Sequence, residues 1–172
     1  MFDFDLTKIK AMVFDVDGVL SCSTIAMDEE GQPLRTLNVK DGYAIQLAVK
    51  RGLVVAIISG GRSQNIVRRY EYLGVRHIYM GSSYKLRDLD DLAARTGIAL
   101  DEMLYMGDDI PDYEVMQRVG CPVCPADAAP EIKAISCYIS PFSGGSGAAR
   151  DVVEQVLKAQ GGWMTDKVAF GW

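Results

Sequence analysis

The chain lacks the features that mark several classes of protein. No apolar run approaches the ~20 residues that a membrane-spanning helix needs, and the acidic N-terminus, from Met1 to Asp5, lacks the basic-then-apolar order of a secretory signal. Acidic residues outnumber basic ones by 23 to 18, and the net charge of −5 argues against nucleic-acid binding through a basic patch. We therefore expect a cytoplasmic protein that binds neither nucleic acid nor a membrane.

Cysteines are also few: the four are Cys22, Cys121, Cys124 and Cys137, too few for a disulfide framework. Cys121 and Cys124 have CxxC spacing, but there is no second such pair and the single histidine, His77, lies far off in sequence. A structural zinc site takes four nitrogen or sulfur ligands. Residues three apart on a strand point to opposite faces, so we expect these cysteines to be small buried side chains at a sheet edge.

The composition that is present fits one globular domain, because 172 residues with 49% hydrophobic and 24% charged side chains are typical of that class. Short β-branched runs alternate with helical stretches, which predicts an α/β fold: a Rossmann-like parallel sheet flanked by helices. We expect strands at 9–14, 53–58, 77–80, 103–106, 121–123 and 137–139, and helices at 42–51, 63–73, 84–96, 111–118, 130–134 and 147–160. The first strand is expected to be central, and Asp41 to cap the first helix.

Two segments break this alternation within the single domain expected over 1–172. Residues 21–40 hold two extended runs around a polar turn that contains Gly31 and Pro33, which predicts a β-hairpin inserted after the first strand. The hairpin would project over the carboxyl ends of the sheet or pair with another subunit. Residues 161–172 form a tail without helical periodicity, either a frayed end or an arm that packs on a neighbour.

Carboxylates follow two of the predicted strands. Asp15 and Asp17 lie just past the first strand on the same side of the chain, and Gly18 lets the backbone turn sharply. A second acidic cluster, 107–112, follows the fourth strand in the same manner. Two carboxylate clusters at neighbouring strand ends favour a hard divalent cation, most plausibly magnesium. Each cluster alone is also compatible with an ordinary turn or a capped helix start.

The other two strand ends carry groups suited to phosphate. Ser59, Gly60 and Gly61 follow the second strand and offer a hydroxyl and loop amides for a phosphate oxygen. Lys85 opens the helix after the third strand, where a lysine by itself is most often solvated. The four strand ends therefore deliver Asp-x-Asp, Ser, Lys and Asp-Asp-x-x-Asp in that order.

This order resembles the haloacid dehalogenase-type phosphohydrolase superfamily over residues 9 to 160. The resemblance implies the fold of that superfamily and phosphomonoester hydrolysis. It makes Asp15 the nucleophile that forms an aspartyl-phosphate, Asp17 the acid and base, and Ser59 a hydrogen-bond donor to the transferring phosphoryl group.

The same resemblance implies Mg²⁺ as cofactor. The metal would be held by Asp15, the backbone carbonyl of Asp17 and Asp108, and Lys85 would add a second positive charge against the anionic phosphate. Either Asp109 or Asp112 would order the metal shell.

No cap domain is expected, since only the hairpin follows the first motif and nothing long separates Ser59 from Lys85. This resembles the capless branch that contains 3-deoxy-D-manno-octulosonate 8-phosphate (KDO 8-phosphate) phosphatases, homotetramers whose hairpins associate and whose tails reach an adjacent active site. Local matches lie at 39–42, 59–62, 105–112, 125–128, 144–151 and 159–161. The branch implies a homotetramer that serves lipopolysaccharide precursor biosynthesis.

A sugar acid phosphate would also need cationic side chains for its carboxylate, and Arg62, Arg69 and Arg68 are the candidates, from the same or a neighbouring subunit. Gly60 and Gly61 are expected to contact substrate. Gly61 stands where the sister phosphatases for nine-carbon keto-deoxy sugar acids carry glutamate, which favours the eight-carbon substrate.

The glycine run 144–147 is either an anion site at a helix start or a simple loop. It has Ser146 where many relatives of the eight-carbon enzyme carry arginine.

Two alternatives stay open. The first is a phosphatase for another sugar acid phosphate, including the nine-carbon kind. The second is a non-catalytic oligomerisation module like the phosphatase-like domains fused to sugar-acid cytidylyltransferases. A phosphomutase is disfavoured, since it would need a cap to hold the reoriented intermediate away from water.

Overall fold

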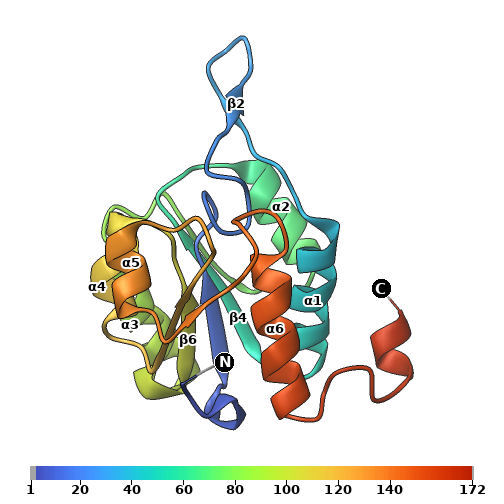
Figure 1. Ribbon diagram of the computed structural model, residues 1–172. Coiled ribbons are helices and arrows are strands. Elements are labelled where there is room, and N and C mark those ends of the chain that lie inside the picture. Colours follow the sequence, from blue (N-terminus) through green and yellow to red (C-terminus); the bar gives the residue numbers. More distant parts are fainter. Residues whose placement is uncertain (1–2, 172) are drawn as a thin grey trace.

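The structure, a computed structural model, describes residues 3–171 and is built on a six-stranded parallel sheet (Figure 1). The predicted parallel α/β fold is confirmed, with the first strand in the centre. The strand order is β5 (His77–Met80), β4 (Val54–Ser59), β1 (Ala11–Phe14), β6 (Met103–Met106), β7 (Cys121–Cys124) and β8 (Tyr138–Ile139).

Helices cover both faces of this sheet (Figure 1). One face is covered by α1 (Val39–Lys50), α2 (Gln64–Tyr72) and α6 (Ala148–Ala159), and the other by α3 (Lys85–Thr96), α4 (Tyr113–Met116) and α5 (Pro130–Ile135). The helix predicted over 111–118 is wrong in form, because a 3₁₀ turn at Ile110–Asp112 precedes a single α-helical turn. That turn is tight because the Asp112 carboxylate folds back to accept a hydrogen bond from the Asp108 N–H.

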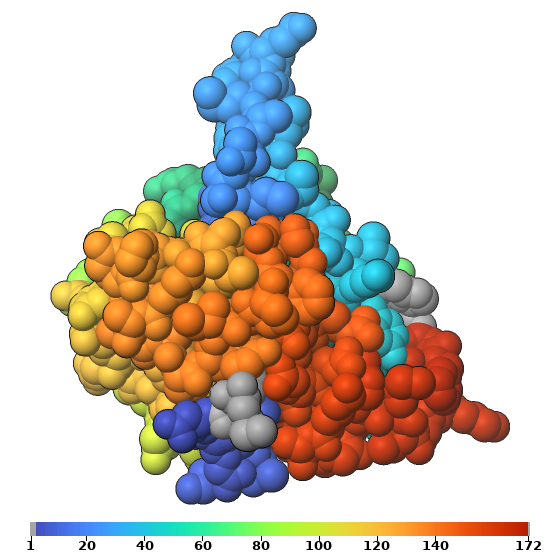
Figure 2. Space-filling model, in the orientation of Figure 1, coloured from blue at the N-terminus to red at the C-terminus, as the bar shows by residue number. Residues whose placement is uncertain are grey.

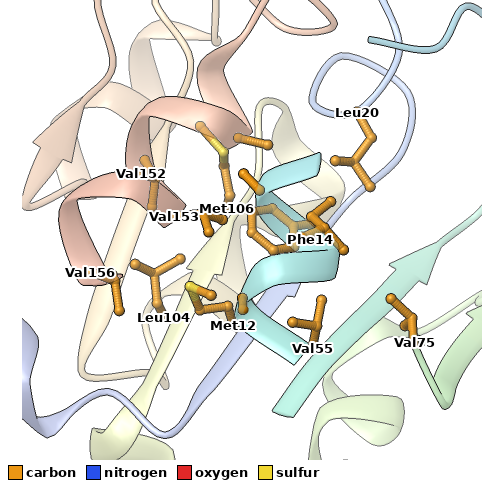
Figure 3. Packing of buried hydrophobic residues seen from close by; sticks show 14 of the residues in the cluster. Met12, Phe14, Leu20, Val55, Val75, Leu104, Met106, Val152, Val153 and Val156 are labelled. Atoms are coloured by element: carbon orange, nitrogen blue, oxygen red, sulfur yellow. The ribbon is translucent and has the colours of Figure 1, made fainter. Parts of the chain in front are cut away.

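Side-chain alternation along β1 divides the core into two layers. Met12 and Phe14 pack under α1 and α6 (Figure 3), whereas Ala11 and Val13 pack under α3 and α4, and all four are fully buried. A strand buried on both faces must be apolar at every position, which is why the sequence shows a continuous run rather than alternation.

The cysteines follow the same division. Cys121 belongs to one core layer and Cys124 to the other, as the CxxC spacing on a strand predicts. All four cysteines are free, and the Cys121 and Cys137 sulfurs lie 3.6 Å apart. In the described part of the chain, no helix combines the length and apolarity needed to cross a membrane.

The inserted hairpin stands away from the rest of the molecule (Figures 1 and 2). Its strands, β2 (Ala26–Met27) and β3 (Pro33–Leu34), are antiparallel and shorter than the extended runs predicted from sequence. They are short because no second layer packs on them: Met27 is 69% exposed and Leu34 54% exposed. A projecting pair with apolar side chains in solvent is a candidate surface for association.

The tail, from Gly161 onward, lies against α1 of its own chain, with Trp172 outside the described residues. The Arg51 guanidinium donates to both oxygens of Asp166, at 2.8 and 3.0 Å. Tyr43 donates to the carbonyl of Ala169 within a 3₁₀ turn, Lys167–Phe170. The segment predicted to be a frayed end or an arm on a neighbour is thus seated on α1 in this single chain.

Asp41 has a different role from the one predicted. Asn38 caps α1, and its side chain accepts hydrogen bonds from the N–H groups of Lys40 and Asp41. Asp41 lies inside the first turn and accepts a 2.7 Å hydrogen bond from the Arg150 N–H in the first turn of α6. The prediction that Asp41 caps the first helix is wrong, because helix α1 begins two residues before it.

Replacing Asp41 with asparagine should change the pH dependence of stability. Burial raises the pKa of Asp41 to about 6 from 3.8, and its second oxygen has no hydrogen-bond partner among the described residues. A raised carboxyl pKa destabilises the fold only when the group is ionised, so the cost is absent below about pH 4 and complete above about pH 6. Asp41→Asn should therefore gain about 1–3 kcal/mol relative to wild type between about pH 4 and 7.5. Urea unfolding at both pH values measures this, and a pH-independent difference would contradict it.

Candidate active site

The polar residues that follow the strands meet at the carboxyl edge of the sheet. The strands β4 and β5 are added on one side of β1 and the strands β6 to β8 on the other, so the strand order reverses between β1 and β6. Phe14 is in register with both Ile57 of β4 and Met106 of β6, so the residues that follow these strands emerge level with one another. In open α/β sheets this switch point is where ligands bind. A cavity of ≈ 670 Å³ opens there, lined among others by Asp15, Asp17, Ser59, Gly60, Gly61, Lys85, Asp108 and Asp112.

Lys85 joins two of the carboxylates. Its ammonium lies 2.9 Å from Asp15 Oδ2 and 2.6 Å from Asp112 Oδ1, and all three residues are buried. The other Asp15 oxygen, Oδ1, accepts a 2.7 Å hydrogen bond from the Val16 N–H. The Asp15 carboxylate is therefore held at both oxygens and faces the cavity.

Three carboxylates gather around this ammonium. Oxygens of Asp15, Asp108 and Asp112 lie within 4.8 Å of one another, whereas Asp109 is not in the group. With all groups ionised, the three acids and Lys85 carry a net charge of about −2, which a divalent cation would balance. Carboxylate oxygens are the ligands that Mg²⁺ prefers, so this donor set fits that ion.

Burial and mutual repulsion shift the pKa values of this cluster. Burial, followed by the negative charge of Asp112, raises the pKa of Asp15 to about 7, and burial followed by the charge of Asp15 raises that of Asp108 to about 8. Burial works against the charged form of Lys85, but Asp15 and Asp112 together outweigh it and raise the Lys85 pKa. The uncompensated negative charge is the electrostatic signature of a cation site.

Gly18 is required at this point by both conformation and space. Its φ is +84°, and a Cβ atom built there would lie 1.9 Å from Asp108 Oδ2. Gly31 in the hairpin also has positive φ, +76°, but nothing lies within 4 Å of its Cβ position. Substitution of Gly31 would therefore cost only backbone strain, whereas substitution of Gly18 would cost backbone strain and a steric clash with Asp108.

We expect Gly18→Ala to lower the free energy of unfolding by about 2–4 kcal/mol, and Gly31→Ala by only about 1 kcal/mol. The difference arises because only Gly18 is packed against a buried carboxylate. Urea unfolding of the two variants measures it, and equal losses would show that the contact with Asp108 is readily relieved.

The segment after β4 completes the cavity wall. The buried Ser59 hydroxyl accepts a 3.2 Å hydrogen bond from the Gly61 N–H, and Ser59, Gly60 and Gly61 all line the cavity. The hydroxyl retains its proton for an acceptor such as a phosphoryl oxygen.

Known proteins are similar to this chain in sequence. Residues 74–150 match the profile of haloacid dehalogenase-like hydrolases. The 3-deoxy-D-manno-octulosonate 8-phosphate phosphatase of Escherichia coli is 40% identical over 154 residues, which cover 90% of this chain and 82% of that protein. The chain belongs to the haloacid dehalogenase-like hydrolases, in the family of these phosphatases.

Solved structures of this hydrolase family agree in fold. The phosphatase of the same name from Yersinia pestis gives a TM-score of 0.88 at 37% identity, covering 92% of this chain and 85% of that chain. The one from Moraxella catarrhalis, solved with a magnesium ion, a phosphate ion and a KDO molecule, gives 0.87 at 36% identity, covering 91% and 90%. As predicted, there is no cap in the described residues of this hydrolase beyond the hairpin.

The structure places the predicted substrate arginines of this hydrolase outside the cavity wall. Arg62 packs beside Gly81, where an added Cβ would lie 2.9 Å from its Nε, and Arg69 packs beside Gly42, where an added Cβ would lie 2.8 Å from its Nη2. Contact of Arg62 or Arg69 with substrate stays a prediction.

The glycine run before α6 packs against the backbone of the first motif in this hydrolase. A Cβ on Gly144 would lie 1.8 Å from the Gly18 carbonyl oxygen, and one on Gly145 would lie 2.6 Å from the Cys22 nitrogen. The Gly144 N–H donates to Asp127 Oδ1 at 2.9 Å, so that amide already has an acceptor within the chain. Of the two interpretations of this run, the contacts favour a packed loop behind the first motif.

Sequence reasoning missed two residues of the site. Tyr105 in β6 is fully buried and donates a 2.7 Å hydrogen bond to Asp112 Oδ1, the oxygen that also contacts Lys85. Arg35, from the hairpin, pairs with Asp17 through two hydrogen bonds of 2.7 and 2.8 Å. Tyr105 is indistinguishable in sequence from an apolar strand residue, and Arg35 from a surface arginine.

Proposed function

We propose that this protein is a magnesium-dependent phosphatase that hydrolyses KDO 8-phosphate through an aspartyl-phosphate on Asp15. The observation that carries the proposal is the convergence of Asp15, Lys85, Asp108 and Asp112 on one cavity. It is supported by the 40% identity to a curated phosphatase of that name over 90% of this chain.

The chemistry divides into two displacements at phosphorus. First, an Asp15 oxygen bonds to phosphorus as the bond to the sugar oxygen breaks, and Asp17 donates a proton to that leaving oxygen. Then a water oxygen bonds to phosphorus, the bond from phosphorus to Asp15 breaks, and Asp17 takes a proton from the water. The first step changes both residues and the second restores both, so one turnover leaves the protein unchanged.

The remaining groups offset charge. Lys85 lies within contact distance of Asp15 and opposes the repulsion between that carboxylate and an anionic phosphate. The Ser59 hydroxyl and the Gly60 amide offer hydrogen bonds to phosphoryl oxygens, and Gly61, whose N–H donates to Ser59, is proposed to contact substrate beside them. When bound, Mg²⁺ supplies further positive charge, and Asp15, Asp108 and the Asp17 carbonyl are the proposed ligands, with Asp112 behind them.

The eight-carbon substrate is the more specific part of the proposal. Gly61 supports it, because this position carries glutamate in the related nine-carbon phosphatases. We expect phosphate release from KDO 8-phosphate to exceed that from a nine-carbon keto-deoxy sugar acid 9-phosphate in kcat/KM, and both to require Mg²⁺.

The same assay separates the alternatives. A large preference for the nine-carbon ester would replace the substrate but keep the phosphatase. Absence of metal-dependent turnover on every ester, including a generic aryl phosphate, would favour a non-catalytic oligomerisation module.

We further propose that residues 1–172 act as a single phosphatase domain, assembled as a homotetramer in the cytoplasm and serving lipopolysaccharide precursor synthesis. The projecting hairpin, with Met27 and Leu34 exposed, supports association through this segment. We expect Leu34→Glu to shift sedimentation from tetramer to smaller species, because it places charge on an apolar contact. Exposed Val168→Glu on the tail is the matched control, and loss of assembly in the control alone would move the interface there.

A further inference from the structure

One charged side chain at the base of the hairpin, that of Arg35, contacts the active-site residue Asp17. Arg35 follows β3 directly, and its side chain is only 7% exposed although Leu34 beside it is 54% exposed. Its Nε donates to Asp17 Oδ1 at 2.7 Å and its Nη2 to Asp17 Oδ2 at 2.8 Å. Both oxygens of Asp17 are therefore held by one planar group, which fixes the direction of the carboxylate.

The arginine also fits closely against the phosphate-binding segment. A Cβ on Gly61 would lie 2.4 Å from Arg35 Nη2 and 3.1 Å from Asp17 Oδ2. A side chain at position 61 would thus collide with the ion pair. Gly61 therefore leaves room for Arg35.

Stability alone is a poor explanation for this contact. Arg35 Nη1 is buried with no hydrogen-bond partner in the described part of the chain, and Asp17 remains 34% exposed. Burial of a guanidinium nitrogen that has no hydrogen-bond acceptor destabilises the fold. An ion pair to a carboxylate that is still partly hydrated offsets little of that free energy. The contact has a clearer benefit for the chemistry of Asp17.

We propose that Arg35 is a positioning residue that holds the Asp17 carboxylate for its role as base in the second half-reaction, and that it couples this role to the seating of the hairpin. The inference rests on the proposed function, in which Asp17 acts as acid and base. Two N–H donors to two oxygens match the ionised carboxylate, which is the form that accepts the water proton.

The hairpin is anchored at the same point by a second, independent contact. The Thr36 N–H donates to Ser21 Oγ at 3.0 Å, and the Thr36 and Ser21 hydroxyls lie 3.3 Å apart. Thr36→Val removes the hydroxyl contact without touching Asp17. It is the matched control for loosening the hairpin alone.

Stopped-flow kinetics with 4-nitrophenyl phosphate and Mg²⁺ separate the two half-reactions. This leaving group needs no proton, so the burst of 4-nitrophenolate reports formation of the aspartyl-phosphate and the steady state reports its hydrolysis. We expect Arg35→Gln to slow hydrolysis by about 10–100-fold and formation by less than about 3-fold, giving a burst near one equivalent per site. Arg35→Lys, which keeps the charge without the bidentate contact, should recover part of the hydrolysis rate.

Asp17→Asn provides the reference for loss of the base, and Thr36→Val should leave the ratio of the two rates at the wild-type value. Equal slowing of both steps by Arg35→Gln, or no slowing of either, would overturn the positioning role while wild-type turnover keeps the phosphatase. Wild-type hydrolysis in Asp17→Asn would instead remove the role of Asp17 on which the inference rests.

Discussion

Asp15→Asn is expected to lower kcat by at least about 10⁴-fold, the largest effect of any single substitution in this chain. The amide has nearly the shape of the carboxylate but cannot form the aspartyl-phosphate. The fold should survive, because Asp15 is only 8% exposed and its pKa is raised to about 7, so the surroundings already tolerate a neutral group. Lys85 keeps its 2.6 Å contact with Asp112.

Phosphate release under saturating substrate measures this loss, with thermal unfolding as the check on folding. Asp109→Asn is the matched control, since Asp109 lines the same cavity but is exposed and stands outside the group of three carboxylates. The control should retain activity within about 5-fold, because it removes only an exposed charge that water screens. A folded Asp15→Asn protein with substantial turnover would reject nucleophilic catalysis by Asp15.

Removal of divalent cations should have the second largest effect, a loss of at least about 10³-fold in turnover that Mg²⁺ restores. The cluster of Asp15, Asp108, Asp112 and Lys85 carries an excess of negative charge, and without a cation the raised pKa of Asp15 leaves part of the nucleophile protonated near neutral pH. The same excess predicts that Mg²⁺ stabilises the fold, by about 2.7 kcal/mol at 100 times its Kd.

Chelation followed by titration with Mg²⁺ tests both effects, using phosphate release and melting temperature as readouts. Asp108→Asn should weaken both responses, because it removes one of the three oxygens that lie within 4.8 Å of one another. Full activity in chelator, or a melting temperature that Mg²⁺ raises equally in wild type and Asp108→Asn, would place the cation elsewhere.

The sheet and the ends of its strands were predictable from sequence, since each depends on local pattern. The run from Ala11 to Phe14 is apolar because both of its faces are buried, and Asp15 marks the point where the strand leaves the core. Parallel strands then bring Asp15, Ser59 and Asp108 to one edge whatever the details of packing. This is why the sequence could place Asp15, Ser59 and Asp108 around one cavity, while their catalytic and metal-binding roles stay predictions.

Long-range contacts were not predictable in the same way. Asp41 was expected to cap its own helix, yet it accepts from Arg150, 109 residues away. Arg35 reaches Asp17 because it lies at the base of the projecting hairpin, where the chain returns to the edge of the sheet, whereas Arg62 and Arg69 lie nearer the second motif in sequence and make no such contact with Asp17 in the described residues. Charge and spacing identify which side chains can bind an anion, but the path of the chain decides which of them does.

A rapid acid quench during turnover of the Mg²⁺-loaded enzyme, followed by peptide mapping by mass spectrometry, is the direct test of nucleophilic catalysis by Asp15. We expect a phosphoryl group on the peptide that contains Asp15, absent from Asp15→Asn and more abundant in Arg35→Gln. Phosphate release from wild type with no such adduct at any time, or an adduct on another residue that persists in Asp15→Asn, would contradict it.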